Sequence, residues 1–325
     1  MLFPILLLLI GFVVLIKGAD FLVNGASSVA KQKGISNIAI GLTVVALGTS
    51  MPEMIVSVFS AVDGRPDAAF GNVIGSNNFN ILLILGLSGA ISPLVVQRNT
   101  IKYEVPLSFL AAFLLFFLVN DAIWGGGSIL HPTGGVLSRL DSFILLALFI
   151  VFLWYIYRTM RVSSEAEEGE PIKIYTTPIS IGLIVLGLAM LVGGGKLVID
   201  NAVSIAQEFG MSEKLIGLTI LAIGTSLPEL ATSLVAAYRR NTDIAIGNVV
   251  GSNIFNILLI LGVTGTITPV NYSAALNFDL LVFMGSTILL MIFMFTLNAR
   301  KLDRWESLIL VMSYIVYTAY LIAYD

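Results

Sequence analysis

Long apolar stretches alternate with short polar connections along most of the chain. Windows of about 20 residues, the length that crosses a bilayer as a helix, recur from end to end. They fall at 2–24, 38–62, 69–91, 104–120, 141–159, 179–201, 214–238, 244–266, 276–297 and 306–323. We interpret the first window as a span rather than a signal sequence, because it lacks a positive leading segment and a convincing cleavage site. The pattern predicts an all-α integral membrane protein with ten transmembrane helices.

One strongly polar connection divides the predicted spans into two groups of five. It lies at 161–177 and contains four glutamates between positions 165 and 170, as is typical of a solvated loop. We therefore expect a first five-helix unit at 1–160, a linker at 161–177 and a second five-helix unit at 178–325.

The two units contain copies of one segment at a fixed offset of 176 residues. Residues 41–93 align with 217–269 without a gap, and roughly 30 of the 53 positions are identical. The identities include Pro, Glu, Asn and Ser, which unrelated lipid-facing helices would not share. Because each unit has an odd number of spans, the second copy enters the membrane in the opposite orientation. The chain is therefore expected to form two inverted five-helix repeats with broken helices at the midplane, as in secondary transporters.

Each copy places one glutamate inside an apolar span. Residues 48–52 and 224–228 read Gly-Thr-Ser-x-Pro, and Glu53 and Glu229 follow at once. A carboxylate near the bilayer centre costs a few kcal/mol or more, so it usually belongs to an ion or proton path. Each proline removes a backbone donor and clashes with the carbonyl four residues earlier, which predicts a helix break there. The freed carbonyls must be satisfied by protein, water or a bound cation.

The donors that these motifs bring together are all oxygen atoms, which suits a hard cation such as Ca²⁺ or Na⁺ and not zinc or copper. One Ca²⁺ or two Na⁺ would neutralise two ionised glutamates, whereas the unpaired carboxylates would repel each other and take up a proton. Calcium takes 6–8 oxygen ligands, of which two bidentate glutamates would supply four. The carbonyls of Thr49 and Thr225, with water, are expected to complete this coordination shell.

The helix after each motif supplies further polar side chains. Ser76 and Asn80 are four residues apart and therefore share a face, and the second copy repeats this spacing with Ser252 and Asn256. The asparagines next to the serines, Asn77 and Asn253, point either to the site or to the neighbouring break.

Composition and charge exclude several classes of protein. With 57% apolar residues, 11% charged residues and a mean hydropathy of +0.97, the chain is not a soluble globular protein. The net charge of −3 gives no reason to expect a nucleic-acid partner, and the absence of cysteine excludes thiolate metal sites. The only histidine, His131, lies in a Gly/Pro-rich loop. We expect neither an enzyme nor an organic cofactor.

The basic residues predict the orientation. If the N-terminus lies outside, the inner connections carry twelve of the 17 Lys and Arg residues and the outer connections carry three. This skew predicts a multi-pass protein of the cell membrane with both termini outside and the linker in the cytoplasm. The remaining two basic residues, Lys17 and Lys196, lie within spans. Asp20 and Asp200 follow them by three and four residues, a spacing that predicts an ion pair within each helix.

The ten spans contain one pair of motifs twice: Gly-Thr-Ser-x-Pro-Glu followed by Gly-Asn-Val-x-Gly-Ser-Asn-x-Phe-Asn. This pattern resembles the repeats of the Ca²⁺/cation antiporter superfamily. The resemblance is closest to its prokaryotic sodium/calcium exchanger branch. It implies that Glu53 and Glu229 are the central ligands of Ca²⁺ and Na⁺. The further ligands that it implies are Thr49, Ser50, Ser76, Asn80, Thr225, Ser226, Ser252 and Asn256. It also implies that the backbone carbonyls of Ala46 and Ala222 bind Na⁺.

The expected function is antiport of Na⁺ against Ca²⁺ by alternating access, with extrusion of Ca²⁺. Potassium dependence is not expected from the resemblance, because some members of that superfamily, including potassium-dependent exchangers, carry aspartate at the position of Asn256, whereas this chain has asparagine in both repeats. An H⁺/Ca²⁺ antiporter of the same superfamily is the alternative, and the neutral oxygens around the glutamates favour sodium. A cation channel is a second alternative, although a highly charged site that exchange must empty favours an antiporter. The expected partners are Ca²⁺, Na⁺ or H⁺, and the lipid bilayer.

Overall fold

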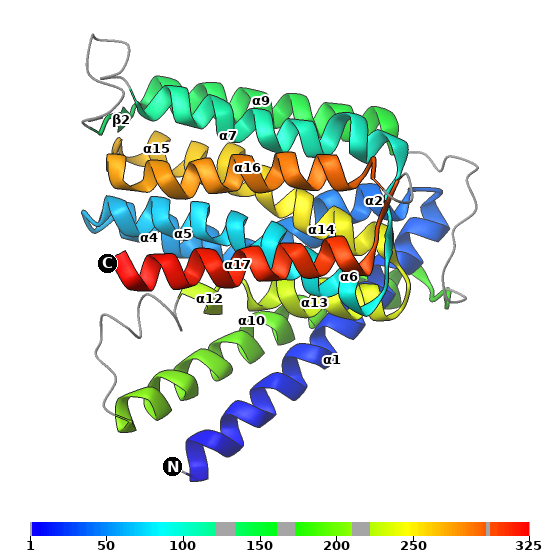
Figure 1. Ribbon diagram of the computed structural model, residues 1–325. Coiled ribbons are helices and arrows are strands. Elements are labelled where there is room, and N and C mark those ends of the chain that lie inside the picture. Colours follow the sequence, from blue (N-terminus) through cyan, green and yellow to red (C-terminus); the bar gives the residue numbers. More distant parts are fainter. Residues whose placement is uncertain (1, 121–133, 161–172, 210–221, 297–299, 325) are drawn as a thin grey trace.

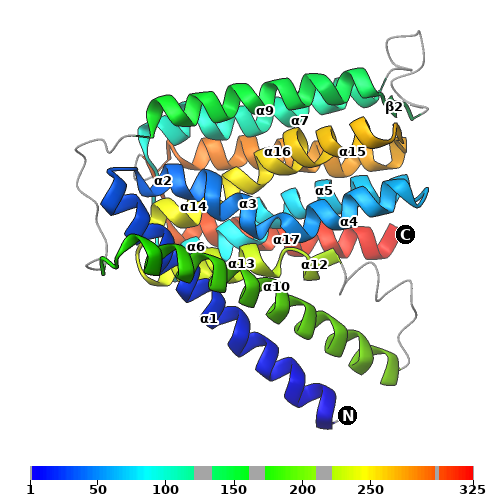
Figure 2. The same cartoon turned by 180° about the vertical axis from the view of Figure 1, so that it is seen from behind.

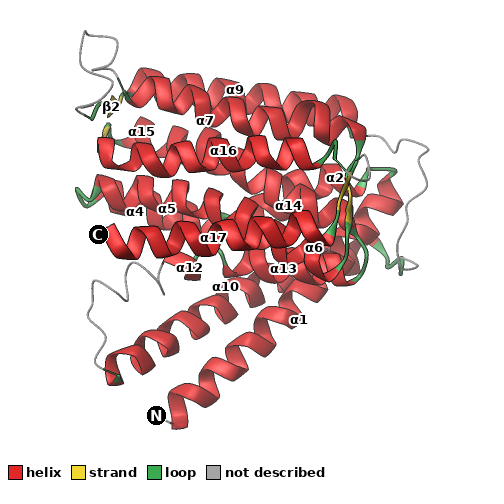
Figure 3. Ribbon diagram, viewed as in Figure 1, coloured by secondary structure: helices red, strands yellow, loops and turns green. Residues whose placement is uncertain are grey.

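The computed structural model describes residues 2–120, 134–160, 173–209, 222–296 and 300–324. Within these ranges the chain is helical apart from turns and four two-residue strands (Figures 1 and 3). Eight of the described helical segments are long and apolar enough to cross a membrane, and a bent pair forms a further candidate. The predicted all-helical membrane protein is confirmed. The loop with His131, most of the linker and the start of the predicted span 214–238 lie outside the described residues.

Each copy of the repeated motif interrupts a helix. The segments are α2 (Asn37–Ile40), η1 (Gly41–Val45), α3 (Ala46–Thr49) and α4 (Met51–Val62) in the first copy, and α12 (Ala222–Gly224) and α13 (Leu227–Tyr238) in the second. Ser50 separates α3 from α4, and the chain bends there by 47°. Ser226 has the equivalent place before α13. Pro52 and Pro228 lie in the first turn of the next helix, where the missing N–H costs no hydrogen bond. The predicted breaks are confirmed.

Two continuous helical runs form the centre of the bundle. They are α5 (Pro66–Asn78), η2 (Phe79–Leu85) and α6 (Gly86–Ile91), and α14 (Thr242–Ile254), η5 (Phe255–Leu261) and α15 (Gly262–Ile267). In their apolar windows 72% and 94% of the residues are buried, against 17–39% in the other candidate spans. The same heptapeptide, Phe-Asn-Ile-Leu-Leu-Ile-Leu, forms the π-helical turns η2 and η5. Such turns insert a residue into a helix and often mark functional sites.

Four further helices cover the central runs. They are α7 (Val105–Val119), which follows η3 (Thr100–Glu104), α9 (Arg139–Thr159), α16 (Asn277–Phe293), which follows η6 (Ala274–Leu276), and α17 (Arg304–Tyr324). They expose large apolar side chains such as Ile150 and Val316, as lipid-facing helices do.

Two short antiparallel strand pairs lie at opposite ends of the bundle (Figure 3). They join β1 (Leu94–Val95) to β4 (Lys301–Leu302), and β2 (Val136–Leu137) to β3 (Val270–Asn271).

Two long helices pack against each other and cross the rest of the bundle at an angle (Figures 1 and 2). These are α1 (Leu2–Lys33) and α10 (Thr177–Glu208). Glycines lie at their contact because no side chain would fit: a Cβ at Gly187 would lie 2.7 Å from the carbonyl oxygen of Gly18. On α10, the predicted pair of Lys196 and Asp200 is confirmed, with Nζ and Oδ2 3.2 Å apart.

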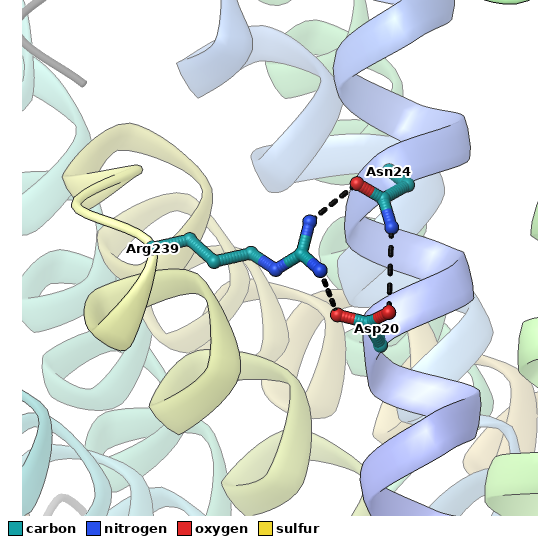
Figure 4. A network of polar contacts seen from close by, with 3 residues as sticks. All are labelled: Asp20, Asn24 and Arg239. Atoms are coloured by element: carbon teal, nitrogen blue, oxygen red, sulfur yellow. Dashed lines mark hydrogen bonds and ion pairs between the residues drawn. The ribbon is translucent and has the colours of Figure 1, made fainter. Parts of the chain in front are cut away.

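Arg239, at the end of α13, joins that helix to α1. Its guanidinium donates to the side-chain oxygens of Asp20 and Asn24, and Asn24 Nδ2 lies 3.5 Å from Asp20 Oδ2 (Figure 4). The predicted pairing of Asp20 with Lys17 is therefore wrong. A guanidinium donates to two acceptors in a fixed geometry, which an ammonium on the same helix does not match.

Candidate cation site

Two carboxyl groups lie inside the bundle, each in the first helical turn after a break. Glu53 on α4 and Glu229 on α13 are both 1% exposed. The first turn of a helix has N–H groups without helical partners and a partial positive charge, and both favour an anion. The breaks therefore place each carboxylate where the backbone offsets part of the cost of burying it.

Each glutamate is hydrogen-bonded by the break of the other copy. Ser226 Oγ donates to Glu53 Oε1 at 2.9 Å, and Ser50 Oγ donates to Glu229 Oε1 at 2.8 Å. The serines of the central runs complete each group. Ser76 Oγ lies 2.9 Å from Ser226 Oγ and 3.5 Å from Glu53 Oε1. In the second copy Ser252 Oγ lies 2.9 Å from Ser50 Oγ. The two motifs, 176 residues apart, thus form one cluster.

Four buried oxygens, on the two glutamates and on the asparagines four residues after Ser76 and Ser252, have no hydrogen-bond partner within the described part of the chain. They are Glu53 Oε2, Glu229 Oε2, Asn80 Oδ1 and Asn256 Oδ1, each with less than 1 Å² exposed. Leaving a buried acceptor unpaired costs about 1–3 kcal/mol, more if it is charged, so several together are expected to have a bound partner. All four are hard oxygen donors, which fits a cation such as Ca²⁺ or Na⁺.

The described residues supply no cationic side chain to the two glutamates: none of their ion pairs involves Glu53 or Glu229. Nor do three carboxylate, imidazole or thiol side chains gather anywhere among them. The cluster therefore has two acidic groups, and its other candidate ligands are neutral hydroxyl, amide and carbonyl oxygens. Glu229 interacts electrostatically with Glu53, so a cation between them would relieve their repulsion.

One family model covers most of the chain. The model described as sodium/calcium exchanger protein matches residues 3–158 and 179–323. The chain belongs to the sodium/calcium exchanger family. The predicted membership of the Ca²⁺/cation antiporter superfamily, in its prokaryotic exchanger branch, is confirmed. This is a family of multi-pass membrane transporters rather than enzymes.

Similar proteins agree on the family and the fold. CaxA of Alkalimonas amylolytica is 41% identical over 323 residues, which cover 98% of each chain. The structure of the sodium-calcium exchanger NCX_Mj, soaked with 2.5 mM Na⁺ and 0.1 mM Ca²⁺, has a TM-score of 0.82 at 31% identity and 98% coverage of both chains. The Ca²⁺/H⁺ antiporter ChaA of Bacillus subtilis is 26% identical over 272 residues, 78% of this chain and 74% of ChaA.

Two asparagines that were not predicted as site residues donate to the backbone of the two glutamates. Asn72 Nδ2 donates to the backbone carbonyl of Glu53 at 3.1 Å, and Asn248 Nδ2 donates to that of Glu229 at 3.2 Å. Their Oδ1 atoms accept hydrogen bonds from the other copy, at 3.2 Å from Thr225 Oγ1 and 3.0 Å from Thr49 Oγ1. Their identity at the 176-residue offset, inside a buried span, was a signal that could have found them.

The two alanines predicted as carbonyl ligands differ in their surroundings. The Ala46 carbonyl accepts from the Ser50 N–H at 3.0 Å, and Thr49 Oγ1 lies 3.4 Å away. Ala222 is the first residue of α12, where the Ser226 N–H donates to the carbonyl of Ile223 at 3.1 Å. The turn before the break in the second copy is therefore tighter than the turn in the first copy.

Proposed function

We propose that the chain is a secondary active antiporter that exchanges Na⁺ for Ca²⁺ by alternating access and extrudes Ca²⁺. The four buried oxygens without partners, on Glu53, Glu229, Asn80 and Asn256, carry this proposal. They come from both copies of the repeat, and hydrogen bonds between the copies hold the segments together. A single hard-cation site shared by two repeats is the arrangement that secondary transporters use.

We assign the ligands as the sequence predicted them. Ca²⁺ takes 6–8 oxygens, and the four free oxygens would supply the centre of its shell, with threonine carbonyls and water as the remainder. The Na⁺ positions would draw on the hydroxyls and carbonyls around the same centre. The full set is Ala46, Thr49, Ser50, Glu53, Ser76, Asn80, Ala222, Thr225, Ser226, Glu229, Ser252 and Asn256. Either one Ca²⁺ or two Na⁺ would neutralise the charge of two ionised glutamates. Calcium and sodium would therefore compete for the site.

We further propose ten spans arranged as two inverted five-helix repeats, 1–160 and 178–325, joined by the linker 161–177. The hydrogen bonds support this, because those of Asn72 recur at Asn248, 176 residues later. The directions of the chain also support it, since α4 and α13 leave their breaks toward opposite ends of the bundle (Figure 1). So does the position of the two strand pairs at opposite ends.

We place both termini outside the cell membrane and the linker in the cytoplasm. The N- and C-termini lie toward the same end of the structure in Figure 1, which agrees with an even number of spans. The excess of Lys and Arg in the connections at the other end indicates that this other end lies in the cytoplasm.

The deciding experiment is ⁴⁵Ca²⁺ flux into proteoliposomes under an imposed sodium, potassium or proton gradient. We expect flux only when the sodium gradient is present and opposed to that of Ca²⁺. Uptake driven by a pH gradient without sodium would replace the sodium assignment with H⁺/Ca²⁺ exchange, the activity that the name of the more distant relative ChaA states. Rapid Ca²⁺ conductance without any counter-ion would contradict the antiporter mechanism and favour a channel.

A further inference from the structure

Two pairs of asparagines cross between the central runs beside the candidate cation site. Asn80 Nδ2 donates to Asn253 Oδ1 at 2.9 Å, and Asn256 Nδ2 donates to Asn77 Oδ1 at 2.9 Å. All four side chains are at most 1% exposed. The sequence left open whether Asn77 and Asn253 point to the site or to the neighbouring break. In the structure each of them instead accepts a hydrogen bond from the candidate ligand asparagine of the other copy.

These contacts leave one end of each candidate ligand amide free in the described structure. A primary amide has an oxygen that can bind a cation and an NH₂ group that repels one, and the two have nearly the same shape. The local acceptors determine the orientation, because the NH₂ group turns to where it can donate. In Asn80 and Asn256 the NH₂ group is held by the other copy, and Oδ1 is the atom left without a partner in the described structure.

We propose that Asn77 and Asn253 are positioning residues of the cation site. Their side-chain oxygens hold the amides of Asn256 and Asn80 so that both Oδ1 atoms face the transported cation. The inference rests on the proposed function, because it presupposes that those oxygens bind Ca²⁺. It adds a specificity device: without the acceptors, either amide can turn its NH₂ group toward the cation.

The alternative role of these asparagines is to join the helices without any effect on the amides. Part of the network fits that description, because Asn77 Nδ2 also donates to the backbone carbonyl of Asn253 at 3.4 Å. Asn253 is the cleaner position to test. Its own Nδ2 has no partner in the described structure, and its carbonyl remains in any variant.

The test is a double-mutant cycle between Asn253→Leu and Asn80→Asp in the full-length protein. Leucine has a similar size but no acceptor, so in the bound state the Asn80 NH₂ group is left unpaired. We expect Asn253→Leu to weaken Ca²⁺ binding by roughly 10- to 100-fold, as expected for one unpaired buried donor. An aspartate at position 80 has oxygen at both ends, so its orientation no longer matters. In that background we expect Asn253→Leu to change Ca²⁺ binding less than about 3-fold.

Equilibrium binding of ⁴⁵Ca²⁺ to the purified protein supplies the affinities, and the thermal midpoint in chelator reports folding. A helix-joining role alone would lower the midpoint and weaken binding equally in both backgrounds, and that result would overturn the proposal. Unchanged binding by Asn253→Leu would overturn it too. The mirror cycle of Asn77→Leu with Asn256→Asp gives a second measurement if one variant fails to fold.

Two further samples separate this inference from the proposed function. We expect the wild type to bind Ca²⁺ and Glu53→Gln to lose that binding. If either expectation fails, the assignment of the cation site is wrong, and the positioning role that depends on it is wrong too. If both hold and the asparagine cycles show no coupling, only the positioning role is wrong.

Discussion

Replacing Glu229 by glutamine tests whether the paired carboxylates bind the cation. Glutamine has nearly the same shape, so Ser50 can still donate to its side-chain oxygen, as it does to Glu229 Oε1 at 2.8 Å. The atom that changes is Oε2, the acceptor without a partner in the described structure, which becomes an NH₂ group. The substitution thus removes one charge and one oxygen ligand without opening a cavity.

The magnitude follows from the burial of the group. Glu229 is 1% exposed, and removing one partner of a buried charge pair costs about 3–5 kcal/mol. This corresponds to a Ca²⁺ complex that is about 10²- to 10⁴-fold weaker. In chelator the variant is expected to be at least as stable as the wild type, because the repulsion between Glu53 and Glu229 is gone.

Thermal unfolding in chelator and in rising Ca²⁺ measures both effects. Ligand at about 100 times its dissociation constant stabilises a protein by about 2.7 kcal/mol, and the variant should gain at most about 0.4 kcal/mol at the same concentration. Flux of ⁴⁵Ca²⁺ in sodium-loaded proteoliposomes should be lost. The matched control is Glu104→Gln, because Glu104 is also a buried glutamate, 3% exposed, and accepts from Tyr155 Oη at 2.6 Å outside the cluster. Normal flux in Glu229→Gln, or equal loss in both variants, refutes the reasoning.

Three further substitutions, two of them with a control variant, test the framework around the site. Gly187→Ala should cost about 1–3 kcal/mol of stability because its Cβ would meet the backbone of α1. Gly193→Ala, at an exposed glycine with no described atom within 4 Å of the added Cβ, should not lower the thermal midpoint, and equal midpoints would contradict the packing argument. Arg239→Gln should cost about 1 kcal/mol, less at high salt, against about 0.5 kcal/mol or less for the exposed pair broken by Lys196→Gln. Melting at two salt concentrations checks this order. Asn248→Leu should weaken ⁴⁵Ca²⁺ equilibrium binding roughly tenfold, and wild-type binding would remove its positioning role.

Features that depend on the local chain could be predicted from the sequence. A proline disrupts the helix just before it whatever surrounds it, and the chain does break at Ser50 and Ser226, immediately before the helices that carry Pro52 and Pro228. The repeat was visible for a similar reason, because identical polar residues rarely recur by chance at one offset in apolar segments. The π-helical turns were not predicted, since their heptapeptide has the composition of any buried helix.

Partners distant in the chain could not be predicted. The spacing of Lys17 and Asp20 favoured a pair on one helix, but Arg239, brought from the far end of α13, donates to Asp20 and Asn24 together. The crossed bonds from Ser226 to Glu53 are of the same kind. The sequence did not predict which glutamate each serine contacts, because nothing in the spacing shows which copy a hydroxyl faces.

The crossed bonds also bear on how two copies can work as one site. The serine at each break donates to the glutamate of the other copy, and each candidate ligand asparagine donates to the other copy as well. A cation among these oxygens would therefore be bound by both copies together rather than by either copy alone. A movement of one copy against the other would change the partners of both glutamates at once, so a cation bound there would link ion load to conformation. That link is what alternating exposure of a single site requires, because a site confined to one copy could move without releasing its ion.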